Sequence, residues 1–218
     1  MSIQILHNEK HFLVCIKPHG VLSENSDGKT DGMVELLSEQ TGCEIYPVHR
    51  LDREASGVMV YARTKAGAGK LSALVQTDGF EKVYLAVVHG KPIEETGVME
   101  DFLFKDSKKN KSFVVKKERK GVKYAKLEYQ TLKTKELDGQ SFSLVKIKLH
   151  TGRTHQIRVQ FSSRNMPLAG DSRYGSRLDG NMCLFSCSIG FVNPFNGKKM
   201  AFEARPDGGH FECFSEIC

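Results

Sequence analysis

One carboxylate of the chain lies between two guanidinium groups, in the run His49-Arg50-Leu51-Asp52-Arg53-Glu54-Ala55-Ser56-Gly57. Nearby positive charge favours the charged form of a carboxyl group, so we expect Asp52 to be ionised. The apolar stretch 58–62 follows and has the length of a buried strand, which places Asp52 in the loop before it. A cluster of surface ion pairs on a turn also explains these residues, so this run alone does not identify a reaction.

A second group of polar residues forms the run 150–158, HTGRTHQIR. Thr154 is a plausible helix cap, and Ile157 and Phe161 would then face the core, because residues four apart share one face of a helix. Arg158 would lie at the edge of this apolar stripe rather than in open solvent. The run therefore predicts a short helix that presents one arginine beside the core.

Several common kinds of site are not supported. His49, His150 and His155 could bind a metal ion with Asp52, but no local ligand spacing supports such a site. The six cysteines include no C-x-x-C pair, so we expect reduced, mostly buried thiols. The sequence contains no P-loop motif and no G-x-S-x-G elbow. The segment 67–69, GAG, falls inside an expected helix, which argues against dinucleotide binding.

Positive charge is concentrated in one segment, although the net charge is only +6. Nine basic side chains lie between residues 105 and 123, against Asp106 and Glu118 alone. A second basic set consists of Arg153, Arg158, Arg164, Arg173 and Arg177. Clustered positive charge favours a polyanionic partner, and nucleic acid is the first candidate. For the lysine-rich segment alone, a solvated basic hairpin is an equally good explanation.

The totals are those of an ordinary globular protein. A chain of 218 residues, 39% hydrophobic and 27% charged, is most simply one domain with its own core. No apolar run approaches the roughly 20 residues that span a membrane. The first residues lack the features of a signal or transit peptide, so we expect a cytoplasmic protein.

The expected elements place the polar groups on a largely antiparallel scaffold. A helix capped by Thr30 or Asp31 should end at Gly42, and a second should run from Thr64 to Gln76. Asn165 suits the left-handed position that follows the third helix. Strands are expected at 3–6, 12–17, 58–62, 81–88, 98–104, 113–116, 122–134, 141–149, 183–192 and 199–204. Short turns join many of them, which predicts an α+β fold with a mixed, mostly antiparallel central sheet flanked by helices and loops.

Two strands carry further information. In the strand 81–88, Tyr84 shares a face with Lys82 and Ala86, and a core tyrosine is the commoner explanation of such a position. In the strand 141–149 the apolar positions switch from even to odd numbers after Leu144. Either a β-bulge or burial of both faces would explain that switch.

Taken in order, these motifs resemble those of the RluA-type RNA pseudouridine synthases. The run 49–52 (HRLD) followed by Ser56-Gly57 resembles the family's catalytic motif. Lys17-Pro18-x-Gly20 resembles its first motif, and 82–86 (KVYLA) its tyrosine strand. The run 151–158, with Pro167, Gly170-Asp171 and Tyr174-Gly175 beyond it, resembles its last motif. The resemblance covers roughly residues 3 to 206.

The resemblance implies a single catalytic domain over residues 1–218, standing alone without the S4 domain that many relatives carry. It implies an isomerase that converts uridine in rRNA or tRNA to pseudouridine and needs neither a cofactor nor a metal ion. Asp52 would attack C1′, attack C6 or remove a proton from C2′; Arg158 would pair with Asp52, and Tyr84 would stack on the flipped uracil and take the C5 proton. Arg50 would fill the gap left by that nucleotide. The implied RNA-binding residues are Arg50, Arg53, Lys82, Lys108, Lys109, Lys111, Arg153 and Arg173.

A monomer is the default expectation for the oligomeric state. Two alternative functions remain at this point. One is a non-catalytic RNA-binding protein on the same scaffold, against which the joint presence of Asp52, Tyr84 and Arg158 argues. The other is a metal-dependent phosphodiesterase that uses Asp52, His49 and His155.

Overall fold

The computed structural model describes residues 1–25 and 31–217. They form two compact units, which are described separately below. Unit 1 comprises Met1–Lys82 and Phe185–Arg205, and unit 2 comprises Val83–Leu184 and Pro206–Cys218. Within the described residues, no helix is both long enough and apolar enough to cross a bilayer. A single catalytic domain over residues 1–218 stays a prediction.

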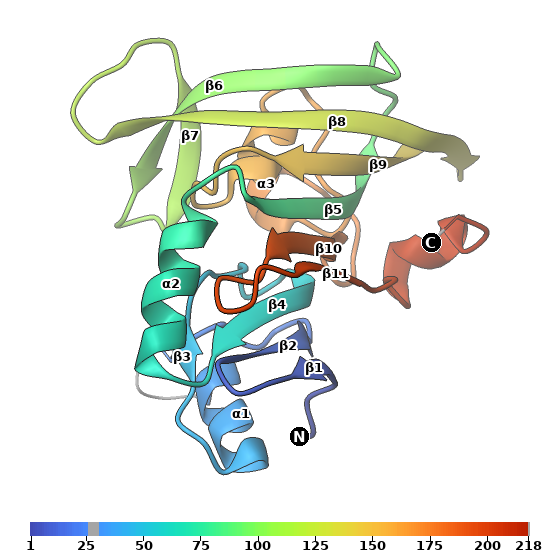
Figure 1. The fold of residues 1–218 in the computed structure, drawn as a ribbon. Helices are drawn as coiled ribbons and strands as arrows, with labels where there is room; N and C mark the ends of the chain where they lie inside the picture. The colour runs from blue at the N-terminus through green and yellow to red at the C-terminus, as the bar shows by residue number, and fades with distance from the viewer. Residues whose placement is uncertain (26–30, 218) are drawn as a thin grey trace. The chain divides into compact units, whose positions relative to one another are not determined.

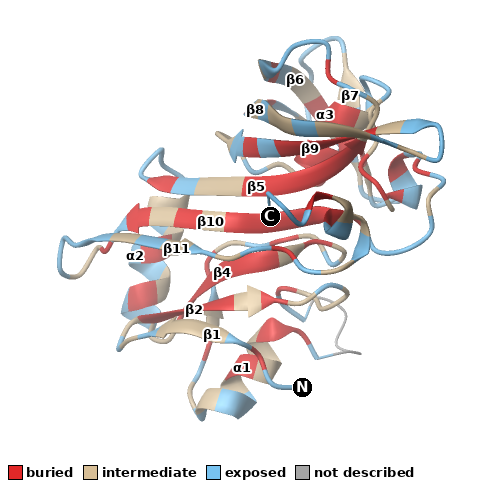
Figure 2. Cartoon of the chain, turned by 90° about the vertical axis from the view of Figure 1, so that its right-hand side faces the viewer, coloured by how far each residue is buried: buried red, intermediate tan, exposed pale blue. Residues whose placement is uncertain are grey.

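The sheet of unit 1 has the strand order β1-β2-β4-β10. Its members are β1 (Ile5–Asn8), β2 (Phe12–Lys17), β4 (Ser56–Ala62) and β10 (Leu184–Val192), while β3 (Tyr46–Pro47) pairs with β4 and β11 (Lys199–Glu203) with β10. The β4–β10 pair is parallel, and the other pairs of this unit are antiparallel. β2 and β4 are buried along nearly their whole length (Figure 2). The Asp52 loop therefore leads into one of the best-buried strands of the unit.

Among the residues described, two helices complete unit 1, and α2 lies against β4 (Figure 1). α1 (Met33–Thr41) ends at Gly42, whose φ of 65° is left-handed, as predicted. Its N-cap is Gly32 rather than Asp31, and Thr30 lies outside the described residues. α2 (Lys65–Val75) begins at the predicted cap, since the Thr64 hydroxyl accepts a hydrogen bond from the Gly67 N–H at 3.0 Å.

The sheet of unit 2 has the order β5-β9-β8-β6-β7, and its pairs are antiparallel. Its strands are β5 (Phe80–His89, in this unit from Val83), β6 (Thr96–Asp106), β7 (Lys111–Val115), β8 (Val122–Leu137) and β9 (Gln140–Leu149). The expected Asp138-Gly139 turn joins β8 to β9, with φ of 49° and 72°. Among the described residues β4–β10 is thus the one parallel pair within a unit, and the mixed, mostly antiparallel α+β fold is confirmed.

The switch of apolar positions in β9 falls where both faces of the strand are buried, because all four residues from Phe142 to Val145 are buried. The β8–β9 register passes from Thr131 opposite Val145 to Lys133 opposite Leu144, so Leu132 is an extra residue in β8. Such a bulge shifts the alternation of side chains by one position. The bulge thus lies in β8 and not in β9, and of the two predicted explanations the burial of both faces of β9 is confirmed.

Helix α3 (Gln156–Ser162) contacts β6 and β7, and its residues from Gln156 to Phe161 are all buried. Its N-cap is His155, in left-handed conformation with φ of 55°, so the expected Thr154 cap is wrong. The loop before the helix is instead fastened by Gln156, whose side chain bonds Thr151, the Arg153 N–H and the Lys126 carbonyl. Asn165 follows the helix with φ of 60°, as predicted. Two short 3-10 helices, η1 (Ser172–Tyr174) and η2 (Gly209–Phe214), also belong to this unit.

Candidate active site

The backbone on either side of Asp52 is held by hydrogen bonds within unit 1. Before it, the Leu51 N–H donates to the Ser23 hydroxyl at 3.0 Å, and that hydroxyl donates to the Leu51 carbonyl at 2.9 Å. After it, the Arg53 carbonyl accepts from the Gly20 N–H at 2.9 Å, and Arg53 Nε donates to the Gly20 carbonyl at 2.9 Å. The Asp52 side chain itself is half-buried. The loop therefore presents this carboxylate from a fixed backbone.

A buried ammonium group lies beneath this loop. The Lys17 side chain is fully buried, and its Nζ donates to the carbonyls of Pro18, Val21 and Arg53 at 2.9, 2.6 and 3.1 Å. Burial lowers the pKa of Lys17 from 10.5 to about 8, although the charges of Asp52 and Glu54 raise it. Lys17 thereby joins the first motif to the Asp52 loop.

His49, three residues before Asp52, is an acceptor in this structure. Its Nε2 accepts a hydrogen bond from the Val60 N–H of β4 at 3.0 Å. Burial, reinforced by the Lys82 cation, lowers the pKa of His49 to about 3, so the imidazole is neutral at pH 7. His49 therefore fastens the catalytic motif to the strand that follows it.

Arg158 is fixed within unit 2 by a buried carboxylate that we did not assign a role from the sequence. Its Nε donates to Asp171 Oδ2 at 2.7 Å and its Nη2 to Oδ1 at 2.9 Å, which is a bidentate pair. The two side chains are 2% and 1% exposed. Arg158 is thus buried, in agreement with the expectation that it lies beside the apolar stripe and not in open solvent. Asp52 belongs to unit 1, so its pairing with Arg158 stays a prediction.

Tyr174 joins Arg158 to the basic hairpin formed by β6 and β7. The Arg158 guanidinium lies 5.1 Å from the centre of the Tyr174 ring, and Lys111 Nζ lies 4.8 Å from it. The phenol oxygen accepts from the Ser112 N–H at 2.8 Å and lies 3.0 Å from His155 Nδ1. The hairpin and α3 therefore share one buried aromatic ring.

The third predicted catalytic residue, Tyr84, lies on β5 opposite Ile147 of β9. It is 5% exposed, so the side of β5 that we expected to be the less apolar is buried at this position. Burial of this kind also fits the core tyrosine that is the commoner explanation of the position. Its contact with a uracil stays a prediction.

Four of the predicted RNA-binding residues come together at the β6–β7 turn, namely Lys108, Lys109, Lys111 and Arg173. The Lys111 ammonium donates to the Arg173 carbonyl at 2.6 Å, and Arg173 Nη1 donates to the carbonyls of Lys109 and Asn110 at 3.3 and 3.1 Å. Asp106 closes the turn by accepting from the N–H groups of Lys108 and Lys109. Two of the cations thus also hold this turn to the η1 loop.

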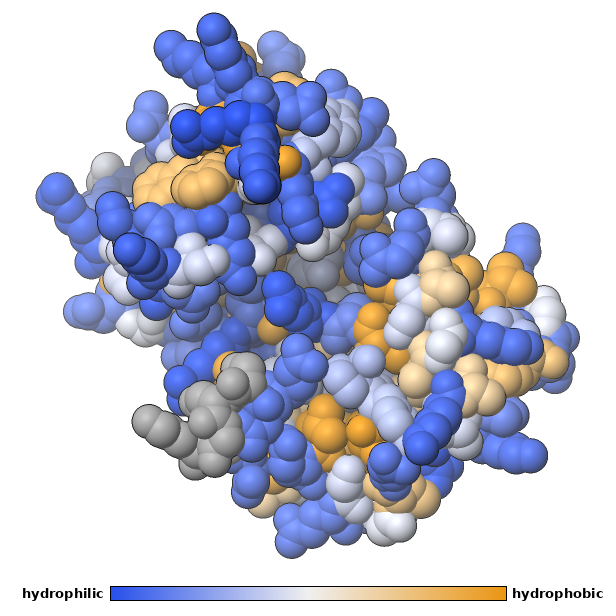
Figure 3. Space-filling model, turned by 90° about the vertical axis from the view of Figure 1, so that its left-hand side faces the viewer, coloured by the Kyte–Doolittle hydropathy of each residue, from blue (hydrophilic) through white to orange (hydrophobic). Residues whose placement is uncertain are grey.

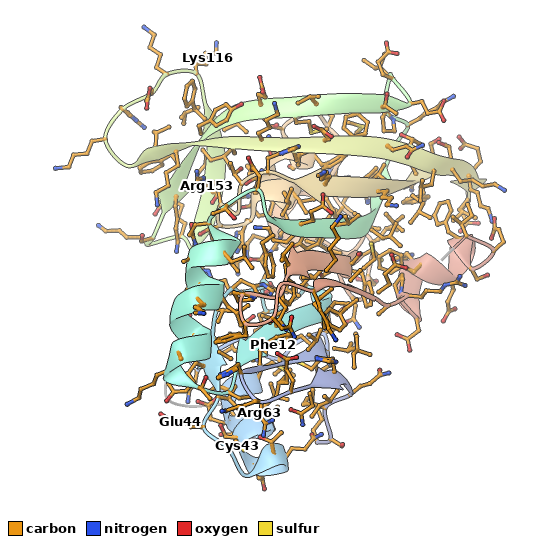
Figure 4. The ribbon with its side chains drawn as sticks, viewed as in Figure 1. Phe12, Cys43, Glu44, Arg63, Lys116 and Arg153 are labelled. Atoms are coloured by element: carbon orange, nitrogen blue, oxygen red, sulfur yellow. The ribbon has the colours of Figure 1, made fainter. Side chains whose placement is uncertain are left out.

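The remaining predicted RNA-binding residues are placed separately. In unit 1, Arg50 and Arg53 are exposed, and the Lys82 ammonium lies 6.0 Å from the centre of the Phe80 ring. In unit 2, Arg153 Nε donates to the Tyr124 carbonyl at 2.8 Å. In Figure 4 Lys116 extends from the β7–β8 loop, and Arg153 lies nearer the strands.

The metal-site alternative gains no support from the ligand geometry. The described residues contain no group of three His, Cys, Asp or Glu side chains arranged to hold a metal ion. His49 Nε2 accepts from Val60, and His155 Nδ1 lies against the Tyr174 hydroxyl. These nitrogens serve the packing of the loops that carry them.

Asp171, Tyr174 and Lys17 are the important residues to which the sequence reasoning gave no role. All three were part of the quoted motifs, so the signal was present. Each of them has a partner that is distant in the chain, 13 residues away for Asp171, 62 for Tyr174 and 36 for Lys17, and no local pattern encodes such distances.

The chain is similar to known proteins over most of its length. The family model described as RNA pseudouridylate synthase matches residues 11–163. An uncharacterized RNA pseudouridine synthase of Aquifex aeolicus is 34% identical over 93% of this chain and 69% of its own length. Ribosomal large subunit pseudouridine synthase C of Buchnera aphidicola is 33% identical, over 93% of this chain and 67% of its own. A tRNA pseudouridine synthase C of Vibrio parahaemolyticus is 27% identical, over 100% and 96%.

A solved structure supports the fold independently. The human RNA pseudouridylate synthase domain containing 1 superposes with a TM-score of 0.79 at 23% identity, covering 94% of this chain and 84% of that one. At this identity the likeness concerns the fold, whereas the family match and the Aquifex relative concern the sequence. This chain belongs to the RNA pseudouridylate synthase family.

Proposed function

We propose that Asp52, Tyr84 and Arg158 carry out the isomerisation of uridine to pseudouridine in this RNA pseudouridine synthase. The reaction breaks the N1–C1′ glycosidic bond, turns the base and joins C5 to C1′. Product and substrate have the same atoms, so the reaction needs no co-substrate. The chain must therefore supply a nucleophile or base, a surface that holds the freed uracil, and a group that takes the C5 proton.

Asp52 begins the reaction in this proposal. The observation that carries the assignment is the fixation of its loop on both sides, by Ser23 at Leu51 and by Gly20 and Lys17 at Arg53. A reacting group gains most from a backbone that holds it in one geometry. Three first steps are consistent with a carboxylate so placed: attack on C1′, attack on C6, and removal of the C2′ proton.

Arg158 is proposed to pair with Asp52 and keep it ionised and oriented. A guanidinium has five N–H donors, and the Asp171 pair uses those of Nε and one of Nη2, so this pair does not exhaust the donors. Asp171 and the Tyr174 ring would hold the guanidinium in place while it contacts Asp52.

Tyr84 is proposed to stack on the flipped uracil and then accept the C5 proton as a general base. Extrusion of the nucleotide is required because the reacting atoms are inaccessible within a stacked helix. Arg50 would occupy the gap that it leaves. Arg53, Lys82, Arg153 and the cations of the β6–β7 turn would contact phosphates, which positions RNA without reading its sequence.

We propose rRNA or tRNA as the substrate, because the names of the Buchnera and Vibrio relatives specify these two classes. Action as a monomer, without a cofactor and in the cytoplasm, is part of the same proposal.

Release of tritium from RNA that carries 5-³H-uridine tests the proposal. The RNA would come from cells that lack this gene, and wild type would be compared with Asp52→Asn, each with and without EDTA. Wild type should release tritium regardless of EDTA, and Asp52→Asn should not. Asp78→Asn is the matched control, because Asp78 is an exposed carboxylate in the α2–β5 turn.

Each of the other outcomes would contradict a different part of the proposal. Loss of wild-type activity in EDTA would support the metal-dependent alternative. RNA binding without tritium release by wild type would support the non-catalytic alternative. Tritium release by Asp52→Asn at the wild-type rate would remove Asp52 from the mechanism. Fractionation of the labelled RNA would then separate rRNA from tRNA as the substrate.

A further inference from the structure

An apolar grid covers one face of the three strands β7, β6 and β8. Across the strands, Val115, Phe102 and Tyr124 are directly opposite one another, and so are Phe113, Phe104 and Val122. Residues directly opposite in antiparallel strands project from the same face. We call the four rings of this grid, Phe102, Phe104, Phe113 and Tyr124, the aromatic platform.

The aromatic platform lies on the face turned away from helix α3. Leu103 and Ala125, which alternate with the platform residues on β6 and β8, are buried in a cluster with Val159 of α3 and with Tyr174. Successive residues of a strand project to opposite faces, so the platform rings cannot join that core. Phe113 is 37% exposed and Tyr124 43%. Figure 3 shows apolar side chains among hydrophilic ones in its upper part, at the height of these strands in Figure 1.

Cations lie next to the platform rings. The Arg119 guanidinium is 5.4 Å from the centre of the Phe104 ring, and Lys111 Nζ is 5.9 Å from that of Phe113. The nearby carboxylate of Glu100 accepts from the Tyr124 hydroxyl at 2.7 Å and pairs with Lys126 at 3.2 Å, so its charge is balanced. The β7–β8 loop, which joins two strands of the platform, adds three exposed lysines, namely Lys116, Lys117 and Lys120.

We propose that the aromatic platform binds single-stranded RNA that flanks the modified uridine, by stacking unpaired bases on its rings. Exposed aromatic rings set among cations are the combination that binds single-stranded nucleic acid, because bases stack on the rings and phosphates meet the cations. The surrounding positive charge favours this occupant over a second copy of the same basic surface, which would be repelled. The proposal rests on RNA as the substrate and adds a base-stacking surface on the face opposite α3.

The test measures binding of a fluorescein-labelled oligouridylate of about 12 nucleotides, within the range that such surfaces cover, by fluorescence anisotropy at one fixed salt concentration. Phe113 is the position to vary, because it is exposed on β7, the last strand of the order in unit 2. Phe113→Ala removes the ring, Phe113→Leu keeps apolar bulk without a flat face, and Phe113→Tyr keeps the ring. Loss of stacking for one base should raise Kd about 5- to 140-fold.

Phe113→Ala and Phe113→Leu should therefore bind the oligouridylate at least about fivefold more weakly, and Phe113→Tyr should bind like wild type. An RNA duplex, whose bases are already stacked, should bind all four proteins equally. Photocrosslinking of an oligomer that carries 5-iodouridine should label the peptide 111–115 in wild type. Thermal melting of each variant verifies that it is folded.

Equal oligouridylate affinity of all four folded proteins would overturn the proposal. So would self-association of wild type that Phe113→Ala abolishes without a change in Kd, since the face would then be an interface between copies. Binding requires no turnover, so a protein that binds as expected but releases no tritium would contradict the proposed function and not this inference.

Discussion

Replacement of Asp171 by Asn tests whether the buried ion pair holds Arg158. The change preserves the shape of the side chain but removes its charge, and it places an amide where one carboxylate oxygen accepted a hydrogen bond. Both side chains are almost fully buried, so water cannot replace the lost interaction. Loss of one partner of a buried pair costs about 3–5 kcal/mol, because the other charge remains buried without compensation. We expect Asp171→Asn at the low end, near 3 kcal/mol, since Asn retains one acceptor.

Urea unfolding would give the free energy of unfolding of wild type, Asp171→Asn, Arg158→Met and the double variant Arg158→Met/Asp171→Leu. Each single variant should lose about 3 kcal/mol, and its melting temperature should fall by roughly 6–12 °C. The double variant should recover most of the loss, since a buried pair can be replaced by apolar residues at little cost. The coupling energy of the cycle should therefore exceed about 2 kcal/mol.

Activity should separate from stability in the same set. The double variant should be stable but inactive in the tritium-release assay, because it lacks Arg158. Asp171→Asn should retain wild-type KM for RNA and lose about tenfold or more in kcat, since a small displacement of a catalytic group is costly. Additive losses of stability in the cycle, or full activity of Asp171→Asn, would refute the view that Asp171 positions Arg158.

Two further predictions concern unit 1. In helix α2, Gly69→Ala should raise the free energy of unfolding by up to about 1 kcal/mol, because alanine favours a helix and nothing lies within 4 Å of the added Cβ. Gly67→Ala should instead lower it, because the added Cβ would overlap a carbonyl oxygen of the β1–β2 turn; urea unfolding that ranks the two variants alike would contradict this. The pKa of His49 is lowered from 6.5 to about 3, so below pH 6.5 the unfolded chain binds a proton there that the folded chain does not. The free energy of unfolding of wild type should consequently fall by about 1.4 kcal/mol per pH unit from this group as pH drops from 6.5 towards 3; unfolding at a series of pH values should show a shallower slope for His49→Gln, and identical slopes would contradict the assignment.

Features encoded within a few residues were predictable from the sequence. Gly42 ends α1 in a left-handed conformation, Thr64 caps α2, and Asp138-Gly139 turns β8 into β9. In each case the residue type determines the local backbone or supplies the adjacent hydrogen bond. The prediction of Thr154 as a helix cap was wrong because the start of α3 does not depend on local residue type alone. Tertiary contacts of the Gln156 side chain and the left-handed conformation of His155 determine it.

In the candidate site, too, some features could be predicted from the sequence and others depend on tertiary contacts. The order of its motifs along the chain was enough to indicate the family and to nominate Asp52, Tyr84 and Arg158. Only the tertiary structure shows that Lys17 is buried under the Asp52 loop, that Asp171 holds Arg158, and that four rings share one exposed face. A buried charge is stable only beside partners that match it, and those partners arrive from distant parts of the chain. The sequence by itself thus nominated the residues that we propose to carry the chemistry, and folding decided which others hold them in place.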